Sequence, residues 1–271
     1  MFYNGREWLE FPLVSGDDEG FVNGYSIYDV LRTYSGIPYN LKRHYERLKR
    51  SADFMALEIP PLEKIKIILD QAKKIHNYEE FRFKIYITPF TSKYKTFYCF
   101  VEELKEDVDL IEEGVVVNIA RERKSSSPII PYYVKTPLNG SIKYVHKKYD
   151  YYYDSIVLNE FGNVTEGTYS NIFYVSGGVL LTPHISSGIL PGITREDVLE
   201  LANDLSLEVE EKTNVQVWEL LSAEEVFLTH TSRGVVPIRR IFPDFTFTVP
   251  GVVTEAILDN WKDFITEKIE D

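Results

Sequence analysis

The sequence is poor in cysteine. Its 271 residues include one, Cys99. A single thiol excludes an intrachain disulfide and a cysteine metal cluster, and we expect no metal site. Structural disulfides belong to oxidising compartments, so this usage favours a protein of the reducing cytoplasm.

Positive charge is also scarce. Lysine and arginine together number 30 against 42 aspartates and glutamates, which gives a formal net charge of -12. Binding to nucleic acid phosphates requires a basic face. The charge balance therefore argues against nucleic acid as the partner and favours a role of the acidic excess in solubility.

Long apolar runs are missing as well. No uninterrupted apolar segment reaches the length of a membrane span. The first twelve residues carry Arg6, Glu7 and Glu10 instead of a basic region followed by an apolar one. We expect neither a membrane partner nor a secretory leader.

What is present indicates a mixed α and β protein. A helix is expected over Asn40–Leu57 and another from Pro60, whereas residues 81–88 alternate as a strand does. Residues 121–130 are charged, rich in serine and interrupted by Pro128, as linkers often are. We therefore expect an N-terminal domain over 1–120, a linker over 121–130 and a C-terminal domain over 131–271.

Two neighbouring stretches carry the strongest local signals. Residues 164–173 read VTEGTYSNIF and residues 187–195 read SGILPGITR. The first predicts a strand, a turn and a second strand, in which Glu166 would ordinarily be a solvated carboxylate. In the second, Gly192-Ile193-Thr194 precedes an amphipathic helix, whose unpaired N–H groups can bind an anion. The ordinary alternative is that Thr194 merely caps that helix.

Together the two stretches resemble the signature of the class IV, fold-type IV pyridoxal-phosphate enzymes. These are the branched-chain aminotransferases, the D-amino-acid aminotransferases and the aminodeoxychorismate lyases. The signature reads roughly V-T-E-G-x-x-S-N-x-F and then I-L-x-G-I-T-R before a helix, and nearly every position is matched. The resemblance implies a two-domain α+β fold with a small α/β N-terminal domain and a larger C-terminal domain on a β-barrel core. It also implies a homodimer and pyridoxal 5'-phosphate as cofactor.

The resemblance implies that Lys135 is the catalytic lysine, which forms the Schiff base with the cofactor and moves the substrate proton. It lies in the segment 132–139, ahead of Glu166 by 166 - 135 = 31 residues, as in the family. Lys143, Lys147 and Lys148 are nearby but are expected on the solvated side of a helix. Pro137 departs from the commonest family pattern.

Further roles follow from the same resemblance. Glu166 would face the pyridine nitrogen, and Leu190 would pack against the ring. The phosphate would be held by an arginine in an H-x-x-R-L-x-x-S helix, by the helix start and by a hydroxyl turn, which in this sequence are Arg47, Gly192, Ile193, Thr194, Thr231 and Ser232. Without the resemblance, Arg47 would meet a carboxylate or solvent, and the hydroxyls would cap their own turn.

On the substrate side the resemblance points to Tyr28 and to either Arg82 or Lys84 as the cation for the substrate carboxylate. An aromatic in a half-buried strand and a solvated sheet face are the ordinary alternatives.

The expected function is pyridoxal-phosphate-dependent transfer of an amino group between an amino acid, branched-chain-like or of broad specificity, and a 2-oxo acid. Subfamily signals conflict. The motif lacks the G-E-N of typical branched-chain enzymes, Pro89-Phe90 replaces the arginine-rich loop of D-amino-acid enzymes, and Arg233-Gly234 is similar to some lyase-like members. A D-amino-acid aminotransferase, an aminodeoxychorismate lyase and a non-catalytic protein are the alternatives.

Overall fold

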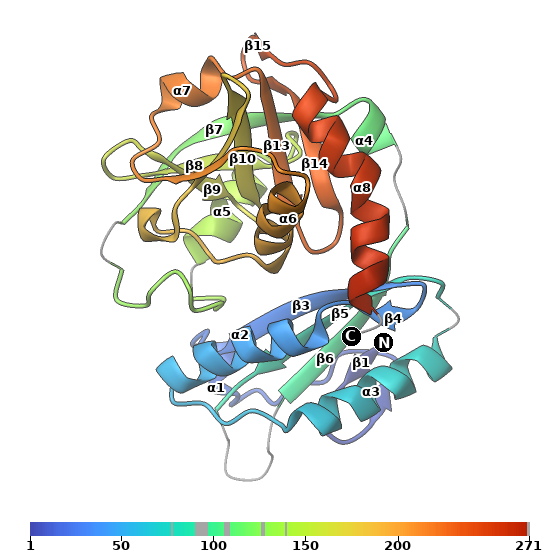
Figure 1. Cartoon of the computed structure of the whole chain (residues 1–271). Helices are drawn as coiled ribbons and strands as arrows, with labels where there is room; N and C mark the ends of the chain where they lie inside the picture. Colours follow the sequence, from blue (N-terminus) through green and yellow to red (C-terminus); the bar gives the residue numbers. More distant parts are fainter. Residues whose placement is uncertain (77, 90–96, 106–108, 126–127, 139, 270–271) are drawn as a thin grey trace. The chain divides into compact units, whose positions relative to one another are not determined.

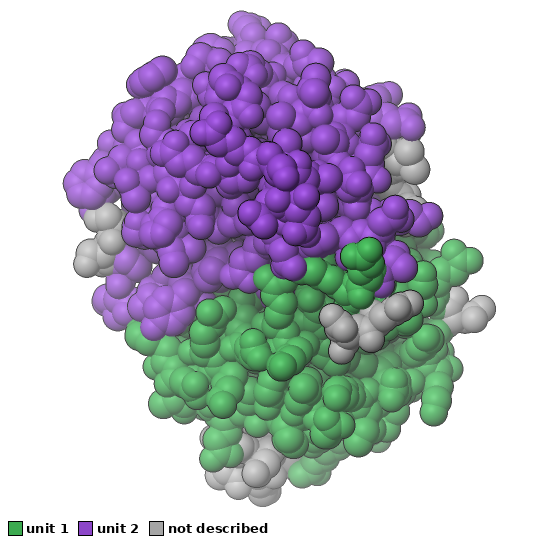
Figure 2. All heavy atoms as spheres, in the orientation of Figure 1, with its two compact units in different colours: residues 1–105, 134–139, 267–271 green, residues 106–133, 140–266 purple. Residues whose placement is uncertain are grey.

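The computed structural model describes residues 1–76, 78–89, 97–105, 109–125, 128–138 and 140–269. These residues form two compact units, coloured separately in Figure 2. Unit 1 comprises Met1–Lys105, Val134–Asn139 and Glu267–Asp271, and unit 2 comprises Glu106–Tyr133 and Gly140–Thr266. Each unit has its own sheet.

Unit 1 is built on an antiparallel sheet in the order β2-β1-β6-β5-β3-β4. Its strands are β1 (Phe2–Tyr3), β2 (Trp8–Leu9), β3 (Ile27–Tyr34), β4 (Ile37–Pro38), β5 (Phe81–Ile87) and β6 (Phe97–Glu103). Its helices are α1 (Glu19–Val22), α2 (Leu41–Phe54) and α3 (Leu62–Ile75). The expected strand and both expected helices are confirmed, and β5 alternates strictly between buried and half-buried residues.

Unit 2 contains a mixed sheet in the order β12-β11-β10-β13-β14-β7-β8-β9, with β15 attached to β14. Its strands are β7 (Val115–Lys124), β8 (Ser155–Asn159), β9 (Val164–Gly167), β10 (Asn171–Ser176), β11 (Val179–Pro183), β12 (Val209–Lys212), β13 (Glu225–His230), β14 (Gly234–Ile241) and β15 (Phe245–Thr246). The edge strand β9 also lies close to β10 and β11, so the sheet curls back on itself (Figure 1). Its inner face encloses one apolar core to which seven of the strands contribute, as expected for a barrel-like domain.

Helices cover this sheet and connect its strands. They are α4 (Asp109–Glu112), α5 (Gly140–Lys148), α6 (Ile193–Asp204), α7 (Val217–Leu221) and α8 (Val252–Ile269), with a 3-10 turn at Ile185–Ser187. A second apolar core lies under α6 and α8, where Val198, Leu201 and Ile257 pack against Phe173 and Phe227 of the sheet. The two phenyl rings stack with centroids 5.0 Å apart. The start of α6 is thereby fixed against the sheet.

The compact units divide the chain differently from the domain limits expected at 1–120, 121–130 and 131–271. Strand β7 runs through residues 121–124 of the expected linker and pairs in parallel with β14 and β8 of unit 2. Residues 134–139, in turn, belong to unit 1. Within the described ranges, no helix is long and apolar enough to cross a membrane, and no group of three or more histidine, cysteine, aspartate or glutamate side chains is placed to hold a metal ion.

Candidate active site

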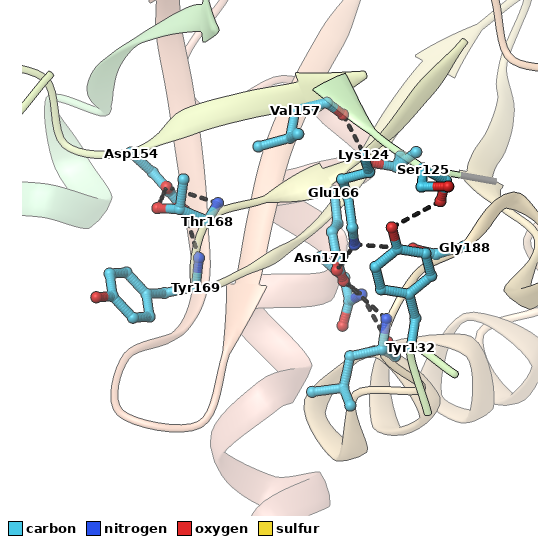
Figure 3. Close-up of polar contacts among 12 residues, drawn as sticks. Lys124, Ser125, Tyr132, Asp154, Val157, Glu166, Thr168, Tyr169, Asn171 and Gly188 are labelled. Carbon is cyan, nitrogen blue, oxygen red and sulfur yellow. Dashed lines mark hydrogen bonds and ion pairs between the residues drawn. The ribbon is translucent and has the colours of Figure 1, made fainter. Parts of the chain in front are cut away.

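Glu166 is a buried carboxylate at the centre of the site in unit 2. It lies in β9, all of whose residues are buried, and it is 7% exposed. Its Oε1 accepts a hydrogen bond from Lys124 Nζ at 2.5 Å. Its Oε2 accepts from the Leu190 backbone N–H at 2.9 Å and from Asn171 Nδ2 at 3.1 Å (Figure 3). The alternative of a solvated glutamate is therefore wrong.

The three donors fix the orientation of the Glu166 carboxylate. A buried carboxylate is costly unless it is paired and hydrogen-bonded, and Lys124 supplies the opposite charge. An ionised carboxylate offers about four acceptor positions. The donors among the described residues occupy three of them, so about one position is left for a further N–H donor.

Lys124 is the buried partner of Glu166 that sequence reasoning missed. It is the last residue of β7 and is 6% exposed. Its ammonium also donates to the Gly188 carbonyl at 2.8 Å and lies 3.9 Å from the centroid of the Tyr132 ring. The charged, serine-rich composition of 121–130 predicts a linker, and a lysine in a linker would be expected in solvent. The β-branched run that begins at Val115 was the available signal, because its strand continues to Lys124.

The turn after Glu166 is held by one aspartate. Asp154 accepts hydrogen bonds from the Thr168 backbone N–H at 2.9 Å and from Ser170 Oγ at 2.6 Å. Gly167 lies so close to this network that a Cβ at that position would be 2.2 Å from Ser170 Oγ and 2.4 Å from Asp154 Oδ2. Only glycine fits there, and the tight turn brings Asn171 of β10 back to Glu166.

Helix α6 starts directly beside the acid. Gly192 is its N-cap and makes no side-chain cap hydrogen bond, so Thr194 is the second helical residue and the alternative that it is the N-cap is wrong. A Cβ on Gly192 would lie 2.1 Å from Asn171 Oδ1. Ile193 and Thr194 are buried at this start, where backbone N–H groups have no acceptor one turn earlier. The other two predicted hydroxyl residues, Thr231 and Ser232, are half-buried in the turn between β13 and β14.

In unit 1, Arg47 is the centre of a second buried group. It is 2% exposed, and its Nε and Nη2 are each 2.7 Å from an oxygen of Asp29. His44 Nδ1 lies 2.7 Å from Asp29 Oδ1. Burial opposes ionisation of Asp29, but the charges of Arg47 and then His44 outweigh it and hold the pKa of Asp29 well below its usual range. Burial lowers the pKa of His44 despite the opposing effect of Asp29.

Lys135 lies in the same unit as Arg47, on the segment that returns from unit 2. Its backbone N–H donates to Ser51 Oγ at 3.1 Å, and its carbonyl accepts from the Tyr28 N–H at 3.0 Å. Its Nζ is 5.3 Å from the centroid of the Tyr28 ring. The structure thus brings Lys135, Tyr28 and helix α2 together. Lys147 and Lys148, which the sequence predicts to be solvated, form surface ion pairs.

The two candidate substrate cations differ in their surroundings. Arg82 pairs with Glu102 on the neighbouring strand, where Arg82 is half-buried and Glu102 is exposed. Lys84 instead places its Nζ 5.2 Å from the Tyr28 ring centroid and 4.8 Å from that of Tyr86. Burial, followed by the charge of Arg82, lowers the pKa of Lys84. Tyr28 is therefore in contact with Lys84 and Lys135, whereas Arg82 faces a carboxylate. Pro89 is described, but Phe90 lies outside the described residues.

Unit 2 offers a charge-compensated acid beside a helix start, and unit 1 offers a lysine held next to a buried arginine. An enzyme that works through a lysine amine and a bound anion needs groups of these kinds. Residues 26–241 match the family model of amino-transferase class IV, and the chain belongs to the class IV aminotransferase family. It is an enzyme of that family, which uses pyridoxal phosphate.

Individual relatives agree with this assignment. The chain is 40% identical over 260 residues to a "probable branched-chain-amino-acid aminotransferase" of Thermotoga maritima, with 95% of this chain and 90% of the relative covered. It is 30% identical to an aminodeoxychorismate lyase of Bacillus subtilis, with 89% and 86% covered. A solved structure of a Thermotoga maritima protein assigned as a branched-chain amino acid aminotransferase superimposes with a TM-score of 0.87 at 35% identity, covering 98% of this chain and 95% of that one. The expected two-domain fold-type IV architecture is confirmed.

Proposed function

We propose that this chain binds pyridoxal 5'-phosphate and transfers an amino group between an amino acid, branched-chain-like or of broad specificity, and a 2-oxo acid. The observation that carries the proposal is the hydrogen bonding of Glu166. Three donors hold this buried carboxylate and leave about one acceptor position. A protonated pyridine nitrogen is a single N–H donor that fits this position. When bound, the cofactor supplies an electron sink.

Lys135 is the proposed catalytic base and covalent anchor. Its backbone is held on both sides, by Ser51 and by Tyr28, while its side chain extends along the Tyr28 ring. A flexible amine on a fixed backbone can bond to an aldehyde carbon and later carry a proton at the substrate Cα. Glu166 would accept a hydrogen bond from the protonated ring nitrogen, and a protonated ring would favour loss of the substrate Cα proton.

The phosphate is the proposed ligand of the remaining residues. Arg47 is pre-oriented by Asp29, which also neutralises much of its charge, so it offers directed donors more than net charge. The N–H groups of Ile193 and Thr194 at the start of α6 complement an anion. Leu190 would pack against the ring, because its backbone N–H holds Glu166. Gly192, Thr231 and Ser232 complete the set by the family resemblance.

For the substrate carboxylate we propose Lys84 together with Tyr28. Lys84 is the better placed cation because it contacts Tyr28, which also contacts Lys135. Arg82 is already paired with Glu102. No metal takes part in this proposal.

An absorbance titration tests the function. The cofactor-loaded protein is mixed in turn with L-leucine and with D-alanine, and the Lys135→Ala variant serves as control. We expect L-leucine to convert the cofactor to its amine form and to leave the corresponding 2-oxo acid, and we expect no conversion in the variant. Conversion by D-alanine alone would assign the D-amino-acid branch instead.

A lyase acting on aminodeoxychorismate is the second candidate. It is favoured by the 30% identity to the Bacillus subtilis lyase and by the half-buried Arg233 in the β13 to β14 turn. Aminodeoxychorismate is therefore the third ligand of the titration. Release of pyruvate, with no response to either amino acid, would replace the aminotransferase proposal.

The resemblance further supports a cytoplasmic homodimer. Light scattering of the cofactor-loaded protein is expected to give twice the chain mass of 31.5 kDa. A single-chain mass across the working concentration range would contradict the dimer.

A further inference from the structure

Lys124 is enclosed by three partners of different chemistry. Its ammonium contacts the Glu166 carboxylate at 2.5 Å, the Gly188 carbonyl at 2.8 Å and the face of the Tyr132 ring at 3.9 Å. An ammonium has three N–H donors, so this set satisfies a lysine cation. Figure 3 shows the three partners around the lysine amine.

The enclosure is built into the local backbone. The Tyr132 hydroxyl donates to the carbonyl of Ser125 at 2.6 Å, which ties the ring to the residue directly after Lys124. Gly188 has a φ of +85°, and a Cβ there would lie 3.1 Å from two carbons of the Tyr132 ring. Glycine at 188 therefore permits both the turn and the close approach of the ring.

We propose that Lys124 is a positioning residue for Glu166, and that it is not the lysine that bonds to the cofactor. It holds Oε1, while Leu190 and Asn171 hold Oε2, so the carboxylate would present one orientation to the ring nitrogen. This inference rests on the proposed role of Glu166 in binding the cofactor.

The contacts of Lys124 and Lys135 indicate which of the two amines can bond to a carbonyl carbon. An amine attacks a carbonyl carbon only as the neutral base with its lone pair exposed. Lys124 Nζ is hydrogen-bonded to the Glu166 carboxylate and covered by the face of the Tyr132 ring, so it is not open to a carbonyl carbon. Lys135 has its backbone fixed and its amine beside Tyr28.

Stability of the cofactor-free protein tests the ion pair. Lys124→Met keeps the approximate shape but leaves Glu166 buried without its counter-charge. We expect its melting temperature to fall by roughly 5–10 °C, and the double variant Lys124→Met/Glu166→Gln to recover most of the loss. Lys148→Met, which removes a half-exposed partner of Glu122, is the matched control with little change.

Absorbance of the loaded protein tests the positioning role. Removal of a cation makes the surroundings of the cofactor more negative, which favours protonated forms. In Lys124→Met the pH at which the bound cofactor changes colour should therefore rise, whereas Lys124→Arg, which keeps the charge, should stay near the native value. If Lys124 only filled space, the colour-change pH of Lys124→Met would stay at the native value, because methionine fills a similar volume.

Borohydride trapping followed by peptide mapping tests the assignment of the lysines. We expect the label on Lys135 in the native protein, in Lys124→Met and in Lys124→Arg. A label on Lys124 of the native protein would overturn the inference. The inference would also be overturned if Lys124→Met had the native melting temperature and the native colour-change pH. A label on Lys135 in that variant would still support the proposed function. If no lysine is labelled in any protein, the proposed function fails and this inference falls with it.

Discussion

At the scale of single residues, the site depends on how closely backbone and side chains approach one another. Gly167 and Gly192 both have negative φ angles, so their backbone conformations are open to any residue. Their neighbours are what require glycine, because each faces a polar atom at a distance that a Cβ could not keep. Glycine is thus required at these two positions because the side chains of Ser170 and Asn171 lie too close for a Cβ. Both side chains lie in the turn and strand that follow Glu166.

The Gly192→Ala variant tests this reading. Its added Cβ would lie 2.1 Å from Asn171 Oδ1, so either Asn171 or the start of α6 must move. We expect a loss of stability of about 1–3 kcal/mol from the overpacking. We also expect weaker pyridoxal phosphate binding, measured by fluorescence titration, because Asn171 also holds Glu166.

Gly16→Ala is the control for that experiment. No heavy atom lies within 4 Å of a Cβ at residue 16, so the substitution should change neither stability nor cofactor affinity. Native cofactor affinity in Gly192→Ala would contradict the role given to this close approach.

At the scale of elements, helix α2 carries three polar residues on its buried face. His44 and Arg47 both meet Asp29 of β3, and Ser51 accepts the N–H of Lys135. Polar groups in this position are stable only because each has a partner. One helix thus fixes the candidate phosphate ligand and the backbone of the candidate catalytic lysine.

This arrangement predicts a loss of stability in acid. Burial lowers the pKa of His44 in the folded protein, so the unfolded chain binds the extra proton first as the pH falls below about 6.5. The pKa of Asp29 is also lowered, so its contribution is present above its unfolded pKa and is lost only in stronger acid. Unfolding free energy should fall between about pH 6.5 and 5, by at most about 1.4 kcal/mol per pH unit for one proton.

Urea unfolding at several pH values measures this effect. His44→Gln should flatten the dependence between about pH 6.5 and 5. Asp29, Arg47 and Lys135 are the charged groups that face His44. An unchanged slope in His44→Gln would show that other groups govern the acid response.

At the scale of the whole molecule, the sequence predicts which segments form helices and strands better than it predicts which strands pair with one another. The alternation in 81–87, the spacing in α2 and the two motif stretches each report local burial, and each was confirmed. Local patterns do not report which strand a segment pairs with. For that reason the composition of 121–124 predicts a linker where β7 continues, and it does not point to Lys124. The segment Val134–Asn139, expected in the C-terminal domain, lies in unit 1.

Residues 134–139 belong to unit 1, and β7 belongs to the sheet of unit 2. We therefore predict that the chain does not divide at 121–130 into two parts that fold independently. A fragment of residues 1–120 lacks Val134, Lys135 and Thr136. Val134 is fully buried, and Thr136 Oγ1 donates to the Ser26 carbonyl at 2.6 Å. A fragment of residues 131–271 lacks β7, which stands between β14 and β8 in the sheet of unit 2. Its removal would expose the edges of both neighbours.

Circular dichroism and thermal melting of the two fragments, compared with the full chain, measure this prediction. We expect neither fragment to melt cooperatively alone. We also expect a mixture to recover a transition only if the fragments reassociate, because unit 1 then regains residues 134–138 and unit 2 regains residues 115–120 of β7. A fragment of 1–124 is the informative control, since it carries all of β7 and still lacks residues 134–138. Cooperative melting of 1–120 by itself would show that the returning segment contributes little to unit 1, and that Lys135 is held less firmly than its two backbone hydrogen bonds indicate.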